Sequence, residues 1–179
     1  EIIFTILLLI KVTSSFGQNN EPIAGPVFND IGAVFSLDSL DFQLDSSQQL
    51  KAIFDIDRKQ SDPSKHNSII SSLHRYYNMH VRSGVPKDNI RLALVLHGGS
   101  TKDALSSSVY KEKFNVDNPN KDLIKSLSDI GVEIFICGQS MSYNGYNKAD
   151  LLPQVKVALS AMTVLTVYQM NNYAWQHRN

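Results

Sequence analysis

From Lys51 onward, strand-like and helix-like segments alternate along the chain, and this alternation limits the possible folds more than any other feature. Short runs rich in β-branched and aliphatic residues predict strands at 52–56, 91–96, 132–137 and 155–158. Apolar residues at helical spacing predict helices at about 63–83, 103–114 and 119–130. We therefore predict an α/β fold: a three-layer sandwich with a mostly parallel sheet of about five strands and helices on both faces.

Particular residues mark where the predicted helices begin and end. Asp62-Pro63 and Asn118-Pro119 each place a capping side chain before a proline, which favours a first helical turn. Gly84 and Gly131 follow the helical patterns and predict their ends.

The C-terminal part carries two further predicted elements. Ser160 can cap a last helix in which Ala161, Val164, Leu165 and Tyr168 share a face, although its β-branched residues also permit a strand. Residues 173–175 predict an edge strand.

The first residues differ in character from the rest. Residues 2–10 are an apolar run, and small and polar residues then lead to Gln18, which is typical of a secretory signal peptide. We expect a signal peptide at 1–17, cleaved before Gln18; a short core helix is the alternative. A bilayer span needs about 20 apolar residues, so the run at 2–10 is too short to be one. We therefore expect an exported protein, periplasmic or secreted, with no membrane span in the mature chain.

The mature chain is predicted to consist of an N-terminal extension at 18–50 and one α/β domain at 51–179. Val27-Phe28 and Val34-Phe35 could form short strands of the extension. A hydrophobic content of 42% over 179 residues is enough for a real core. The 17 basic residues balance 17 acidic ones, so the basic stripe of a nucleic-acid-binding protein is not expected.

Cys137 is the only cysteine in the chain, and it ends the predicted strand at 132–137. Gly138, Gln139 and Ser140 follow, in a strand–turn–helix pattern. The free amides and positive dipole end of a helix beginning there would favour a thiolate. Gln139 and Ser140 would add donors around the sulfur, although Ser140 could equally cap the turn. Cys137 is thus either a buried apolar residue or a thiol that reacts with a partner outside its own chain.

His97 ends the predicted strand at 91–96, so it and Cys137 both follow the carboxyl ends of strands. In parallel sheets ligands gather at these ends. His97 could deprotonate the thiol, or simply bond nearby backbone. Gly98 and Gly99 would let the backbone approach a bound anion.

No metal or cofactor is expected. The plausible metal ligands lack paired C-x-x-C or H-x-x-x-H spacing; they are His66, His74, His80, His97 and Cys137. The loop at Gly98-Gly99 lacks the spacing and the lysine of a phosphate-binding loop.

Four segments together resemble the DsrE/DsrF-like family, and most closely its exported bacterial branch. They are Leu96-His97-Gly98-Gly99, Asn118-Pro119-Asn120, Cys137-Gly138-Gln139-Ser140 and Ser160-Ala161-Met162-Thr163. Their order and their element types match the family from Lys51 to the C-terminus, which leaves the extension outside the resemblance.

The resemblance implies a function and an assembly. Better-studied members of the family are small α/β sandwiches that form trimers or hexamers, and several carry sulfur as a persulfide at the position of Cys137. It implies a sulfur carrier or a sulfurtransferase-like protein that holds a persulfide on Cys137. With the residue patterns described above, we expect Cys137 and His97 to be catalytic and Gly98, Gly99, Gly138, Gln139 and Ser140 to bind substrate. The expected partners are a small sulfur donor or a thiol-bearing acceptor protein, and further copies of the chain. The alternatives are a non-catalytic oligomeric binding module of the same fold in the cell envelope, and a thiol redox sensor.

Overall fold

The computed structural model describes residues 21–37 and 39–178, and the predicted signal peptide lies outside them. In this part of the chain, five strands form one sheet in the order β4-β3-β2-β1-β5, and every neighbouring pair is parallel. The strands are β1 (Leu50–Ile56), β2 (Ile90–Leu96), β3 (Glu133–Cys137), β4 (Val155–Ala158) and β5 (Ala174–Arg178). The predicted fold class is confirmed.

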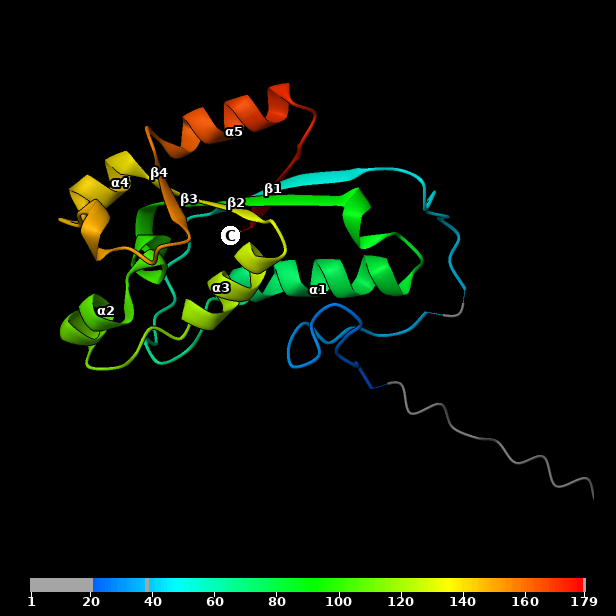
Figure 1. Cartoon of the computed structure of the whole chain (residues 1–179), viewed down its shortest axis with the longest axis horizontal. Helices are drawn as coiled ribbons and strands as arrows, with labels where there is room; N and C mark the ends of the chain where they lie inside the picture. The colour runs from blue at the N-terminus through cyan, green and yellow to red at the C-terminus, as the bar shows by residue number, and fades with distance from the viewer. Residues whose placement is uncertain (1–20, 38, 179) are drawn as a thin grey trace, which may run out of the picture.

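Helices cover both faces of the sheet (Figure 1). On one face lie α1 (Ser68–Arg82) and α3 (Lys121–Asp129), and on the other lies α5 (Ala161–Met170). Nearer the carboxyl ends of the strands are α2 (Ser107–Phe114), α4 (Gly138–Tyr143) and the 3₁₀ helix η2 (Gly98–Ala104). Two further 3₁₀ turns are η1 (Lys87–Asn89) and η3 (Lys148–Asp150).

Each face of the sheet has its own apolar core. The larger core joins the sheet to α1 and α3, through residues such as Leu73, Leu94 and Ile124. The smaller core lies under α5 and consists of Ile53, Ala93, Val95, Cys137, Ala161 and Val164. Alternate side chains of β2 enter the two cores, so this strand is buried on both faces.

Two helices begin later than the proline signals predict. Asp62 accepts a hydrogen bond from the amide of Ser64 inside its own turn, and α1 begins only after Asn67. Asn118 likewise accepts from the amide of Asn120, and α3 begins after Asn120. Asp and Asn side chains can close local turns of this kind. Asp62 and Asn118 therefore each start a turn, and Asn67 and Asn120 are the residues that directly precede the helices.

The predicted C-terminal elements are confirmed. Ser160 caps α5, because its Oγ accepts from the amide of Thr163 at 3.1 Å. Asn172 adopts a left-handed conformation (φ 63°) after the helix, and the chain continues into β5 at the edge of the sheet.

The extension lies against the outer side of α1 and is held by one side chain above all. Asn78 of α1 is completely buried. Its amide group bonds five backbone groups of the extension at 2.9 to 3.1 Å: the N–H groups of Val27 and Phe28 and the carbonyls of Phe28, Ile31 and Gly32.

A second side chain of α1 completes the attachment. Arg82 donates to three carbonyl groups of the extension at 2.7 to 3.0 Å. Ile23 and Val34 form an isolated antiparallel bridge. The predicted strands at 27–28 and 34–35 are therefore reduced to this one bridge in the described extension, because Asn78 and Arg82 bind backbone groups that a strand ladder would use.

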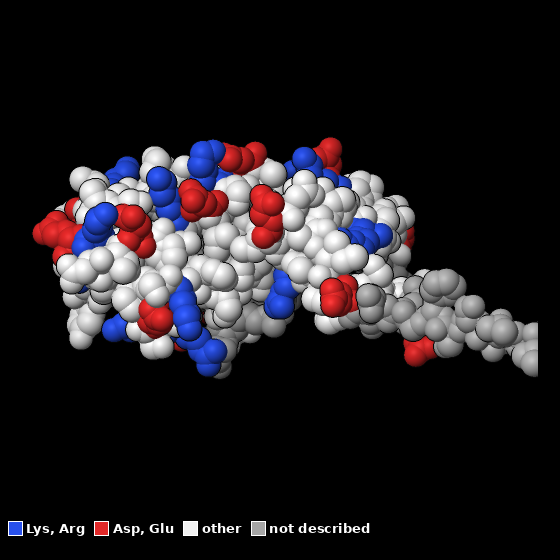
Figure 2. Space-filling model, turned by 90° about the horizontal axis from the view of Figure 1, so that it is seen from below, with Lys and Arg blue, Asp and Glu red and all other residues white. Residues whose placement is uncertain are grey.

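None of the helices in the described part of the chain is long and apolar enough to cross a membrane. The face seen from below in Figure 2 carries acidic and basic side chains side by side, without a continuous basic stripe.

Candidate thiol site

Cys137 lies at the carboxyl end of β3, where two helices begin beside it. It is the N-cap residue of α4, and its Sγ accepts from the amide of Ser140 at 3.5 Å. The backbone amide of Ala161, the first residue of α5, also lowers the pKa of the thiol. The first amides of a helix have no partner within the helix, so they favour negative charge on the sulfur.

These contacts lower the pKa of Cys137. Burial acts in the opposite direction and raises the pKa, because the residue is only 5% exposed. The hydroxyl and amide of Ser140, with the amides of Ala161 and Gln139, lower it by more than burial raises it. Cys137 is thus both buried under α5 and held as a readily ionised thiol, which combines the two readings of the sequence.

Ser140 is predicted to be the largest single contributor to this effect. In Ser140→Ala the thiol pKa should rise, and the midpoint of a thiolate absorbance titration should move to higher pH. The lowered pKa adds stability above the unfolded value of about 8.5, which is lost as the pH falls through the folded pKa. Ser142→Ala, in the same helix, is the control. An unchanged midpoint in Ser140→Ala would contradict this account.

Ser140 also connects the segments that follow β2 and β3. The amide of Gly98 donates to Ser140 Oγ at 3.2 Å. Asn144 Nδ2 donates to Thr101 Oγ1 at 3.2 Å and to the carbonyl of Ser140 at 2.8 Å. η2 and α4 therefore form one hydrogen-bonded unit at the carboxyl end of the sheet.

His97 is next to Cys137 in the register of the sheet, but it bonds a different residue. Leu96 pairs with Ile136, so His97 and Cys137 occupy the following level. His97 Nε2 lies 2.7 Å from Oδ1 of Asp55. No hydrogen bond joins His97 to Cys137 in the described residues, so a role for His97 as base toward this thiol stays a prediction.

The three glycines of the predicted site allow close packing of the chain. Gly98 adopts a left-handed conformation (φ 51°). A Cβ on Gly99 would lie 2.6 Å from Cβ of Lys59, and one on Gly138 would lie 2.6 Å from the carbonyl oxygen of Ala158. These contacts explain the glycines without a ligand, and their substrate contacts stay predictions.

An open cleft of about 850 Å³ lies between η2 and α4. It is lined by Gly98, Gly99, Gln139, Ser140, Ser142, Tyr143 and Asn144. Four of the predicted binding residues thus share this cleft, whereas Cys137, His97 and Gly138 do not line it. None of the lining side chains carries a charge.

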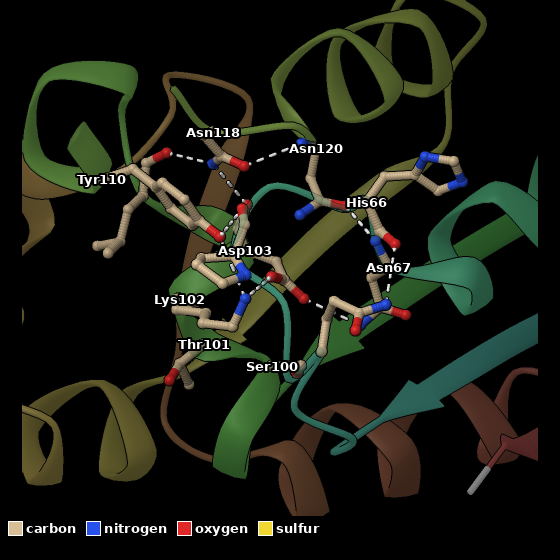
Figure 3. Close-up of polar contacts among 12 residues, drawn as sticks. His66, Asn67, Ser100, Thr101, Lys102, Asp103, Tyr110, Asn118 and Asn120 are labelled. Carbon is tan, nitrogen blue, oxygen red and sulfur yellow. Dashed lines mark hydrogen bonds and ion pairs between the residues drawn. The ribbon is translucent and has the colours of Figure 1, made fainter. Parts of the chain in front are cut away.

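A buried polar network holds η2 in place (Figure 3). Lys102 Nζ lies 3.2 Å from Oδ1 of Asp103 and 3.2 Å from the hydroxyl of Tyr110. The other oxygen of Asp103 accepts from Asn67 Nδ2 at 2.9 Å. The network therefore fixes η2 to the start of α1.

The Asn118-Pro119-Asn120 segment belongs to the same network. Asn118 Nδ2 donates to the carbonyls of Asp103 and Leu105, at 3.0 and 2.6 Å. Asn120 Oδ1 accepts from the amide of Asn67 at 2.7 Å. This motif therefore fixes the end of η2 and the start of α1 relative to each other.

Sequence reasoning missed Asp55, the partner of His97, although a signal was present. Asp55 is the one acidic residue in the apolar run at 52–56, and a buried carboxylate in a strand needs a partner. In the described part of the chain, no three His, Cys, Asp or Glu residues are placed to hold a metal ion.

These features define the class of protein. It is an α/β protein with a parallel five-stranded sheet and a cysteine at the carboxyl end of one strand, where two helices begin. The model of the DsrE/DsrF-like family matches residues 51–175. The chain belongs to this family, as its four motif segments predicted.

A solved structure supports the same fold. The chain is similar to MTH1491, a protein of unknown function from Methanobacterium thermoautotrophicum, with a TM-score of 0.55 and 18% identity. The match covers 72% of this chain and 99% of that protein. A comparison with curated proteins found no match.

Proposed function

We propose that the protein is a sulfur carrier that holds sulfane sulfur as a persulfide on Cys137. Membership of the DsrE/DsrF-like family suggests a sulfur-relay role. The observation that carries the proposal is the position of Sγ at the start of α4, where the amide of Ser140 donates to it and neighbouring donors lower the pKa of Cys137. A thiolate is the form that attacks electrophilic sulfur.

The proposed loading step needs no oxidant. The Cys137 thiolate attacks the outer sulfur of a donor persulfide, R–S–SH, so that a new S–S bond forms and the donor S–S bond breaks. The products are Cys137–S–SH and the thiolate R–S⁻. Because the chain has one cysteine, the persulfide has no second thiol in the same chain to displace it.

The uncharged cleft beside α4 is the proposed approach for the sulfur donor, a small molecule, or for a thiol-bearing acceptor protein. Ser140 both bonds Sγ and lines the cleft, so it connects the buried sulfur to this approach.

Intact-mass spectrometry after incubation with polysulfide tests the proposal. Wild type should gain the mass of a sulfur atom, and a thiol reductant should remove it. Cys137→Ser should gain none, whereas Ser128→Ala, in α3 on the opposite face of the sheet from α5 (Figure 1), should load like wild type. Failure of folded wild type to load from polysulfide or a protein persulfide would contradict sulfur carriage and favour the non-catalytic binding module.

We also propose that the chain is exported, because its apolar run at residues 2–10 and the small and polar residues that follow are typical of a signal peptide.

We further propose that the chain assembles with copies of itself through the α5 face. No Asp, Glu, Lys or Arg occurs from residue 157 to 176. Met162 and Met170 are more than three-quarters exposed, at 76% and 78%, and Leu159 is 71% exposed. Light scattering after size exclusion tests the assembly, and a monomer at high concentration would contradict it.

A further inference from the structure

Three ring side chains converge on one buried carboxylate at the carboxyl edge of the sheet. Asp55, near the end of β1, is 4% exposed. Its Oδ1 lies 2.7 Å from His97 Nε2. Its Oδ2 lies 3.1 Å from His177 Nδ1 and 3.3 Å from Trp175 Nε1, both on β5.

The sheet register brings this cluster to the same face as the thiol. Asp55 pairs with His177 on one side and with Val95 on the other. His97 lies two residues after Val95, so both point to the α5 face, where Val95 and Cys137 share a core. A row of reactive groups therefore crosses this face from His177 through Asp55 and His97 to Cys137.

The donors and acceptors of the cluster determine which ring nitrogens of His97 and His177 carry a hydrogen. The indole nitrogen of Trp175 can only donate, and an ionised carboxylate can only accept. The carboxylate therefore accepts from all three rings, so His97 carries its hydrogen on Nε2 and His177 carries its hydrogen on Nδ1. A neutral His97 is thereby left with Nδ1 as its basic nitrogen.

We propose that Asp55 is a positioning residue of the thiol site, which holds His97 in the Nε2–H form so that Nδ1 carries no hydrogen and faces the amide of Ser100 in the capping box of η2, and that β5 holds Asp55 through Trp175 and His177. The three contacts of one buried carboxylate carry this assignment. The C-terminal strand thus takes part in the site although it lies at the far edge of the sheet from β3 and β4.

The role of the base rests on the proposed function and concerns the unloading step. An acceptor thiol R′–SH gives its proton to His97 Nδ1, and the R′–S⁻ formed attacks the outer sulfur of Cys137–S–SH. The S–S bond to Cys137 breaks, and the products are R′–S–SH, the Cys137 thiolate and protonated His97. No electrons are gained or lost overall.

The first test measures the imidazole nitrogens of wild type by ¹⁵N NMR, above the pH at which the histidines are protonated. We expect hydrogen on Nε2 of His97 and on Nδ1 of His177. In Asp55→Asn one carboxamide oxygen cannot accept from all three rings, so at least one histidine should change its tautomer. Asp57→Asn, two residues on in the chain, is the control and should leave both unchanged. Hydrogen on Nδ1 of neutral His97 in wild type would overturn the assignment even if Asp55→Asn failed to fold.

The second test follows the unloading of pre-formed Cys137 persulfide to a small thiol. Asp55→Asn and His97→Gln should each slow the unloading rate about tenfold or more. General-base catalysis typically contributes about 10²–10⁴-fold, so losses of this size are expected when the base is removed or misplaced. The double variant should be no slower than His97→Gln, because Asp55 acts through His97. Normal unloading in folded Asp55→Asn would overturn its positioning role. Failure of wild type to load would instead refute the proposed function. The NMR experiment would still test the His97 tautomer, because it does not depend on loading.

Discussion

Replacing Asp103 with alanine is expected to lower the free energy of unfolding by about 3–5 kcal/mol, because it leaves the ammonium group of Lys102 buried without its counter-ion. Lys102 is 4% exposed and Asp103 is completely buried. Asn67 Nδ2 would lose its acceptor as well. Urea denaturation of wild type and variant, followed by tryptophan fluorescence or circular dichroism, measures the difference.

Two further variants separate a buried ion pair from a general effect of substitution. Lys102→Met with Asp103→Leu should recover much of the loss, since apolar residues of similar volume often replace buried pairs at little cost. Lys125→Ala breaks the exposed pair with Asp129 and should cost less than about 1 kcal/mol. A loss below 1 kcal/mol in Asp103→Ala would contradict the assigned role of the network.

Replacing Asn78 with alanine should detach the extension from α1 while the α/β domain stays folded. The substitution removes five hydrogen bonds to the extension. At about 1 kcal/mol for each, less what water restores, the attachment should weaken by about 2–4 kcal/mol. Limited proteolysis should then cut within 21–36 at concentrations that leave wild type intact.

Asn89→Ala is the matched control for this substitution. Asn89 is half-buried, and its two hydrogen bonds to the carbonyls of Ser46 and Ser47 are exposed and long, at 3.4 Å, so its loss should change the cleavage little. Equal resistance of Asn78→Ala and wild type to the protease would show that Arg82 and apolar contacts hold the extension without Asn78.

The fold could be predicted from the sequence because its strands and helices have distinct apolar patterns. From Leu92 to Leu96, β2 is a continuous aliphatic run because both of its faces are buried there, and β4 was predicted with the same bounds, 155–158. The helix starts were harder, since Asp62 and Asn118 have the side chains of N-caps but close turns of their own. The extension could not be predicted, because its order depends on side chains of α1 about 50 residues away.

The candidate site was predicted in part for the same kind of reason. A cysteine and a histidine that end neighbouring strands must lie close in a parallel sheet, so Cys137 and His97 could be placed together. The sequence marks Asp55 as a carboxylate in an apolar strand that needs a partner, but it does not identify His97 as that partner, because the two lie 42 positions apart and the order of β1, β2 and β5 was unknown. Gly99 and Gly138 were interpreted as ligand contacts, whereas close approaches of the backbone also require them.

The attachment of the extension to Asn78 sets an order of folding events. The extension precedes α1 in the chain, yet its backbone groups have no partners until the helix carrying Asn78 and Arg82 has formed. During synthesis it must wait for about 50 more residues to emerge before it can settle. Refolding followed by pulsed hydrogen exchange should therefore show the amides of Val27 and Phe28 gaining protection after those of α1.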